Sequence, residues 1–137
     1  MRISDVSKIT GLGIHTLRFY EKAGLMGDVA KTRGGLRDYG PDDLERLGVI
    51  ECLKMTGMPL RDIKQFMDWC AMGDKTIRER HDMFVARRRD VDRQMAALKR
   101  TRRIIDFKIK YYADALAAGT LHIYDKRKPK LPDFFKA

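Results

Sequence analysis

An apolar residue recurs at every seventh position along the second half of the chain. Positions 77, 84, 91, 98, 105 and 112 hold Ile, Phe, Val, Leu, Ile and Tyr. A seven-residue repeat keeps one stripe of a helix apolar, as in a coiled coil. The pattern predicts a helix of about 42 residues, roughly 63 Å long by the rise of an α-helix.

A helix of this length needs a second chain, because a domain built from about 70 preceding residues cannot cover it. The positions four residues after each of these apolar residues are polar in the first half of the helix and mostly apolar in the second half. An ordinary amphipathic helix folded back on its own domain is the alternative, and the strict repeat argues against it. We therefore expect residues 73–118 to form an antiparallel coiled-coil dimer with a second copy.

The chain carries a net charge of +10, which favours polyanionic partners through long-range attraction. Most of this excess falls after residue 72. The arginine runs at 87–89 and 102–103 fit the solvated face of a coil better than a DNA-binding stripe. A local basic patch is more informative, and it holds Arg18, Lys22, Lys31, Arg33 and Arg37 against Glu21 and Asp28.

Four short helices are expected before the long one. Ser4 is placed to cap the first, and a glycine turn at 11–13 separates it from a second helix over about 14–23. Gly24 is suited to the left-handed conformation that ends a helix. Pro41 and Pro59 are expected to open the third and fourth helices.

The segment between the second and third helices is rich in glycine. Gly34 and Gly35 lie between two short polar stretches, which predicts the tip of a β-hairpin. The fold class is therefore mainly α. We expect a winged helix-turn-helix domain over 1–72, a dimerisation helix over 73–118 and a basic tail over 119–137.

A helix-turn-helix followed by a hairpin predicts binding to double-stranded DNA, with the second helix in the major groove. Arg18 is able to bind a guanine edge or a phosphate, and Tyr20 to reach a phosphate while its ring packs. The hairpin would bring its arginines to the neighbouring DNA backbone or minor groove. The predicted DNA contacts are His15, Thr16, Arg18, Tyr20, Lys22, Arg33 and Arg37.

Several segments together resemble the MerR family of transcriptional regulators. They are ISDVS at 3–7, TLRFYEKAGL at 16–25, RGGLRDY at 33–39, DLERL at 43–47 and TGMPLRDI at 56–63. The resemblance covers about residues 2–70, and it implies that Tyr39 also contacts DNA. It implies a homodimer that binds a pseudo-palindromic promoter and distorts overlong spacer DNA, so that RNA polymerase can use it.

The resemblance also bears on the signal that such a regulator detects. No Cys or His cluster has metal-ligand spacing, so we expect no metal and no cofactor. Cys52 resembles the thiol of the third helix in the NmlR/AdhR-like branch, which implies a response to aldehyde, oxidative or nitrosative stress. The alternative for Cys52 is a small buried hydrophobe. Cys70 is a weaker candidate.

The sequence also bears on other classes of protein. No nucleophile–base pair, paired carboxylates or phosphate loop indicates an enzyme. An architectural or excisionase-like DNA-binding protein without an effector response is the main alternative, and a coiled-coil adaptor that binds RNA or protein is a third. No apolar run suits a membrane span or a secretory signal, so the cytoplasm is expected. The basic tail either docks on the coil or is disordered.

Overall fold

The computed structural model describes residues 1–124, which divide into two compact units. The first unit is Met1–Arg87, and the second begins at Arg88. Helix α5 runs through this boundary as one continuous element, Ile77–Ala118. The long helix predicted from the seven-residue repeat is thus confirmed, at 42 residues.

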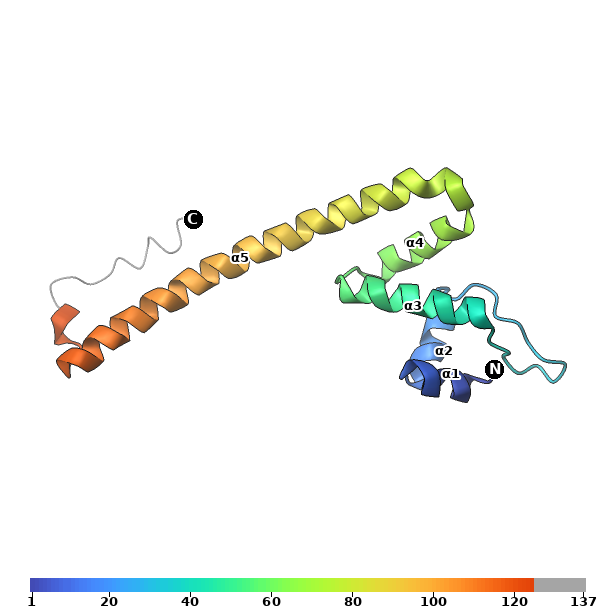
Figure 1. Ribbon diagram of the computed structural model, residues 1–137, viewed down its shortest axis with the longest axis horizontal. Helices are drawn as coiled ribbons and strands as arrows, with labels where there is room; N and C mark the ends of the chain where they lie inside the picture. The colour runs from blue at the N-terminus through green and yellow to red at the C-terminus, as the bar shows by residue number, and fades with distance from the viewer. Residues whose placement is uncertain (125–137) are drawn as a thin grey trace. The chain divides into compact units, whose positions relative to one another are not determined.

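The first unit is built from α1 (Ile3–Thr10), α2 (Ile14–Lys22), α3 (Pro41–Met55) and α4 (Leu60–Ala71) (Figure 1). Helices α1 and α2 pack against each other across a short glycine turn. Their inward residues join a single core with α3 and α4, because each helix is apolar on one side only. The fully buried members of this core include Val6, Leu17, Tyr20, Leu47, Ile50 and Ile63.

The ends of the helices follow the expected signals at most positions. Gly24, two residues after the end of α2, has a φ of 79°, the predicted left-handed conformation. Pro41 occupies the first turn of α3. Ser4 does not cap α1, which begins one residue earlier with Arg2 as its N-cap. The side chain of Asp5 accepts a hydrogen bond from the backbone N–H of Arg2 at 3.2 Å, so a carboxylate inside the first turn does the capping.

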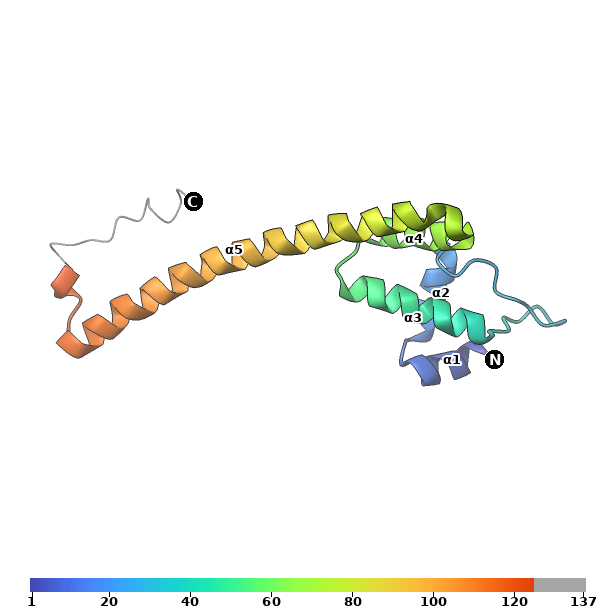
Figure 2. The ribbon, with the colours of Figure 1, turned by 45° about the horizontal axis from the view of Figure 1, so that its top comes forward.

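The loop between α2 and α3 corrects the predicted β-hairpin wing. Within residues 1–124 no strand forms, and the loop has a single antiparallel bridge, between Lys31 and Arg37. The loop between α2 and α3 still reverses direction (Figure 2). The N–H of Thr32 donates to the carbonyl of Leu36 at 2.8 Å, which spans the predicted glycines. A two-stranded ribbon this short, with no third strand beside it, is too weakly paired to form a sheet.

The 3₁₀ turn η1 (Gly73–Thr76) leads into α5, whose first turns belong to the first unit. The ring of Phe84 meets that of Phe66 edge to face, with centroids 5.3 Å apart. The Nε of Arg87 donates to the carbonyl of Thr56 at 2.7 Å, which satisfies a backbone acceptor at the end of α3. The start of α5 is thereby held against α3 and α4.

In the second unit, α5 leaves a row of large apolar side chains exposed. Leu98, Ile105 and Tyr112, which belong to the predicted seam, are 68%, 52% and 55% exposed. The helix ends at Gly119, whose φ is 71°, and the short η2 turn (His122–Tyr124) follows. The basic residues 126–130 and the Phe pair at 134–135 lie outside the described residues. Among the helices of residues 1–124, none has the length and apolar character that a membrane crossing requires.

Candidate nucleic-acid interface

The outward side of α2 carries the basic residues that the sequence predicted for DNA contact. His15, Arg18 and Lys22 are exposed and recur at intervals of three and four residues, so they share one side of the helix. Thr16 is half-buried at its margin. Because the recognition helix of a helix-turn-helix presents such a side to DNA, α2 has the composition that this role requires.

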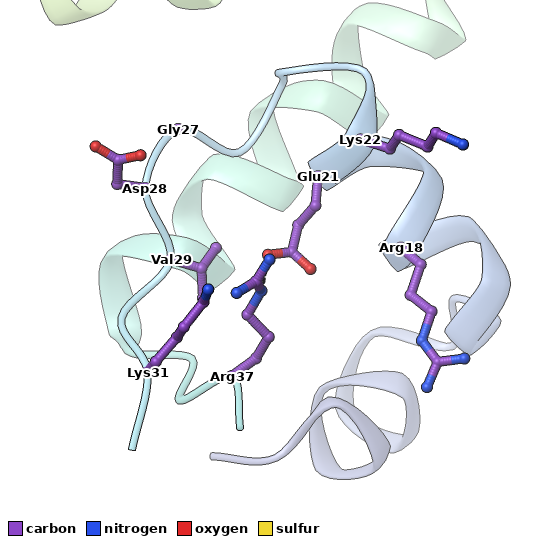
Figure 3. A pocket seen from close by; sticks show the side chains of 8 residues that line it. All are labelled: Arg18, Glu21, Lys22, Gly27, Asp28, Val29, Lys31 and Arg37. Carbon is purple, nitrogen blue, oxygen red and sulfur yellow. Dashed lines mark hydrogen bonds and ion pairs between the residues drawn. The ribbon is translucent and has the colours of Figure 1, made fainter. Parts of the chain in front are cut away.

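A cleft of about 490 Å³ lies between α2 and the following loop (Figure 3). Four cationic side chains border it: Arg18 and Lys22 from α2, and Lys31 and Arg37 from the loop. Two acidic residues, Glu21 and Asp28, border it as well, so basic side chains outnumber acidic ones and the surface suits a phosphate backbone. The structure thus brings together three predicted contacts, Arg18, Lys22 and Arg37. Arg33 lies nearer the loop tip and is exposed.

A second cleft, of about 430 Å³, is bordered by α2, the loop tip and the start of α1. Arg18 and Arg37 border this cleft as well, together with Arg2. Arg2 is not among the residues predicted from the sequence, because it stands outside the basic patch. Its position immediately before the first helix could have indicated a role in DNA binding, because helix starts in small DNA-binding domains often approach phosphate.

Glu21 is the acidic residue common to both clefts. The Nε of Arg37 donates to its Oε1 at 2.6 Å, and the hydroxyl of Tyr39 donates to its Oε2 at 3.0 Å. The carboxylate side chain is only 14% exposed, whereas that of Arg37 is 40% exposed. Both oxygens of one carboxylate on α2 therefore hold groups from the loop.

The two tyrosines predicted as DNA contacts are core residues, each 2% exposed. The hydroxyl of Tyr20 donates to Oε1 of Glu51 at 2.7 Å and accepts from Nζ of Lys54 at 2.6 Å. Burial, and then the carboxylate of Glu21, raise the pKa of Tyr39 to about 12. Burial likewise raises the pKa of Tyr20. These hydroxyls are engaged inside the protein, so the structure places both tyrosines behind the cationic surface and not on it.

Cys52 lies on α3 and is exposed in the single chain, contrary to the alternative of a buried hydrophobe. It borders a groove of about 580 Å³ whose walls are mainly apolar and include Val49, Leu53, Phe66 and Phe84. Glu51, the preceding residue, and Lys54, two residues further on, both hold the hydroxyl of Tyr20. Cys52 therefore sits one residue from a polar contact with the recognition helix.

The remaining candidates for a ligand site are isolated. Cys70 is exposed on α4. The Nδ1 of His81 lies 3.0 Å from Oδ1 of the neighbouring Asp82. Within the part of the chain that the structure describes, no three His, Cys, Asp or Glu side chains gather closely enough to hold a metal ion.

Comparison with known proteins gives two family matches. The family described as MerR HTH family regulatory protein matches residues 1–69, and the family described as MerR, DNA binding matches residues 44–106. An uncharacterized HTH-type transcriptional regulator of Haemophilus influenzae is 37% identical over 123 residues, which is 90% of each chain. The regulator AdhR of Bacillus subtilis is 31% identical over 88 residues, covering 64% of this chain and 63% of AdhR.

Solved structures agree with these matches. The crystal structure of HiNmlR, a MerR family regulator lacking the sensor domain, bound to promoter DNA, has a TM-score of 0.66 at 36% identity and covers 89% of this chain and 97% of that one. A MerR family regulator from Bacillus thuringiensis has a TM-score of 0.62 at 34% identity, covering 80% and 96%. The chain therefore belongs to the MerR family, in the branch of AdhR and NmlR, and is a DNA-binding transcriptional regulator and not an enzyme.

Proposed function

We propose that the chain acts as a homodimer that binds a pseudo-palindromic promoter and distorts it, with RNA polymerase as its partner there. The observation that carries this proposal is the cleft between α2 and the loop, which Arg18, Lys22, Lys31 and Arg37 border. Phosphate contacts at such a surface would position α2, and a few base contacts would supply sequence discrimination. The exposed apolar row of α5 supports the dimer.

The relative bound to promoter DNA lacks a sensor domain, and this chain matches nearly its whole length. That relative binds promoter DNA without its sensor domain. Distortion of the spacer between promoter elements is a mechanism that two DNA-binding domains and a coil can perform, since bending energy depends on the sequence deformed. The predicted contacts His15, Thr16 and Arg33 complete the proposed DNA surface.

Replacement of Arg18 by Ala tests this surface. We expect weaker binding to promoter DNA, by about tenfold at moderate salt, and a shallower dependence of affinity on salt, because at least one phosphate or guanine contact is lost. Arg93→Ala is the control, since it removes the same charge from an exposed position on α5. Equal effects of the two substitutions would contradict a specific role for Arg18.

Mapping the binding sites in the genome separates a regulator from the architectural alternative. Sites inside overlong promoter spacers are expected for the proposed function. Scattered sites, or sites at the ends of integrated phage DNA, would favour an architectural or excisionase-like protein and contradict promoter regulation.

We further propose that Cys52 detects electrophiles. The mainly apolar groove beside it would admit a small apolar electrophile such as an α,β-unsaturated aldehyde. The thiolate sulfur would bond to the β-carbon, the carbon–carbon π electrons would shift to form an enolate, and the enolate would take a proton from water. The added group would occupy the groove beside α3, and so disturb the helix whose Glu51 and Lys54 hold Tyr20 of α2.

Cys52→Ala tests the detection step. We expect the variant to bind promoter DNA normally but to lose the change in transcription that an α,β-unsaturated aldehyde causes in the wild type. Cys70→Ala is the matched control, because it removes the other exposed thiol and should keep the response. A full response in the Cys52 variant excludes this cysteine as the detector.

A further inference from the structure

We infer that Glu21, an acidic residue on the recognition helix, is a positioning residue for DNA binding that holds Arg37 of the loop in place to bind a backbone phosphate. The inference rests on the proposed DNA-binding role of the two clefts. It assigns to an acid a favourable effect on binding to a polyanion, which charge alone would not predict.

The geometry joins α2 to the loop through a single carboxylate. Oε1 of Glu21 accepts from Nε of Arg37 at 2.6 Å, and Oε2 accepts from the hydroxyl of Tyr39 at 3.0 Å. The Glu21 side chain is largely buried, whereas that of Arg37 remains 40% exposed. In Figure 3 the side chains of Glu21 and Arg37 point toward each other, while those of Arg18 and Lys22 extend away from this pair.

The bond uses only part of the arginine. The guanidinium has five N–H donors, and Glu21 takes the one on Nε. The two terminal nitrogens form the other edge of the planar fork, which matches the oxygens of a phosphate. Arg37 borders both clefts, so a phosphate in either one lies against the arginine that Glu21 holds.

Holding the arginine in advance strengthens binding because a long flexible side chain otherwise loses its freedom when DNA binds. The loop has one bridge, between Lys31 and Arg37, and the N–H of Asp38 donates to the carbonyl of Ala30 at 2.8 Å. These contacts restrain the backbone of Arg37 but leave its long side chain free to rotate. A short charge-assisted contact to a rigid helix supplies the missing restraint.

Glu21→Gln gives a test in which two explanations predict opposite changes in affinity for DNA. If Glu21 acted only as a negative charge near DNA, its removal would tighten binding. As a positioning residue, its removal weakens binding about fivefold and lowers the salt dependence toward that of Arg37→Ala. Asp28→Asn is the matched control, since Asp28 borders the same cleft and is exposed, and we expect that variant to bind more tightly.

The double variant Glu21→Gln/Arg37→Ala shows whether the effect passes through Arg37. We expect it to bind no more weakly than Arg37→Ala alone. Weakening in addition to that of Arg37→Ala, or tighter binding by Glu21→Gln alone, would overturn the inference. A thermal unfolding midpoint is measured for each variant, and loss of affinity that only accompanies unfolding at the assay temperature also counts against it.

The same data separate this inference from the proposed function. If neither Arg18→Ala nor Arg37→Ala weakens binding, the clefts are not the DNA surface and the proposed interface fails. If both weaken binding and Glu21→Gln strengthens it, the interface stands and the positioning role of Glu21 is wrong.

Discussion

On helix α2, some of the polar side chains face solvent, and others lie in the core and contact other helices. Arg18 and Lys22 are exposed and line the cleft between α2 and the following loop. Tyr20, between them in sequence, points into the core and binds Glu51 and Lys54. A helix of 3.6 residues per turn turns neighbours to different sides, so a basic and aromatic run such as 18–22 cannot all face DNA.

The exposure of the arginines follows from the sequence because a long charged side chain rarely lies in a core. The burial of the tyrosines does not follow, because a tyrosine suits both a buried and an exposed position, with an apolar ring and a polar tip. Tyr39 and Tyr20 are core residues, and the hydroxyl of each donates a hydrogen bond to a carboxylate. Only the packing of α3 and of the loop against α2 supplied those carboxylates.

Tyr39 leads to a prediction about stability at high pH. Burial and Glu21 raise its pKa to about 12 in the folded state, from an ordinary value near 10. The neutral phenol is favoured by folding, so this stabilisation is complete below pH 10 and is lost as the pH rises through 12. The free energy of unfolding should fall over that window, with Tyr39 contributing about 2 kcal/mol of the fall.

Urea unfolding of the wild type and of Tyr39→Phe between pH 9 and 11.5 checks this effect. We expect the stability of the variant to decline less steeply, because it has no phenol at this position to ionise. Tyr20 and Lys54 titrate in both proteins, so the difference between the two curves isolates Tyr39. Parallel curves would show that its ionisation is not linked to folding.

Among the elements, the helices agreed with prediction better than the loop. Pro41 begins α3, and Gly57, with a φ of 77°, follows its end. These signals are local, since each depends on one residue and its backbone conformation. The loop depended on pairing between two short segments, which the glycines at 34–35 favour but do not secure. The result is a reversal with one bridge in place of a hairpin.

Helix α5 gives a prediction at the scale of one element. Ile105 belongs to the seven-residue repeat and is 52% exposed in the single chain. Ile105→Lys would place a charge in each copy of a dimer seam, and we expect the dimer dissociation constant to rise by at least about tenfold. Sedimentation analysis measures the change.

A control for this prediction lies on the same helix. Ala96 is exposed and stands five residues after Val91, about 140° around the helix from the seam. Ala96→Lys adds the same charge and should leave the dimer intact. If the two variants dissociate equally, net charge and not the seam controls assembly. DNA affinity should fall with the dimer, because one subunit engages only half of a two-fold site.

At the scale of the whole molecule, the sequence by itself determined the succession of helices, the long apolar repeat and the MerR family membership. These properties depend on periodicity and on local helix signals, which neighbouring residues carry without help from distant ones. The exposure of the seam was also implied, since the preceding residues are too few to cover it.

Only the tertiary structure decided which polar groups of the DNA-binding unit meet. Glu21 and Arg37 are 16 residues apart, and Tyr20 and Glu51 are 31 apart. Arg2 and Arg37 are far apart in the sequence, yet both border the second cleft. No periodicity records such pairs, because a hydrogen bond or ion pair depends on how elements pack in three dimensions, and that packing is chosen by the apolar core they share.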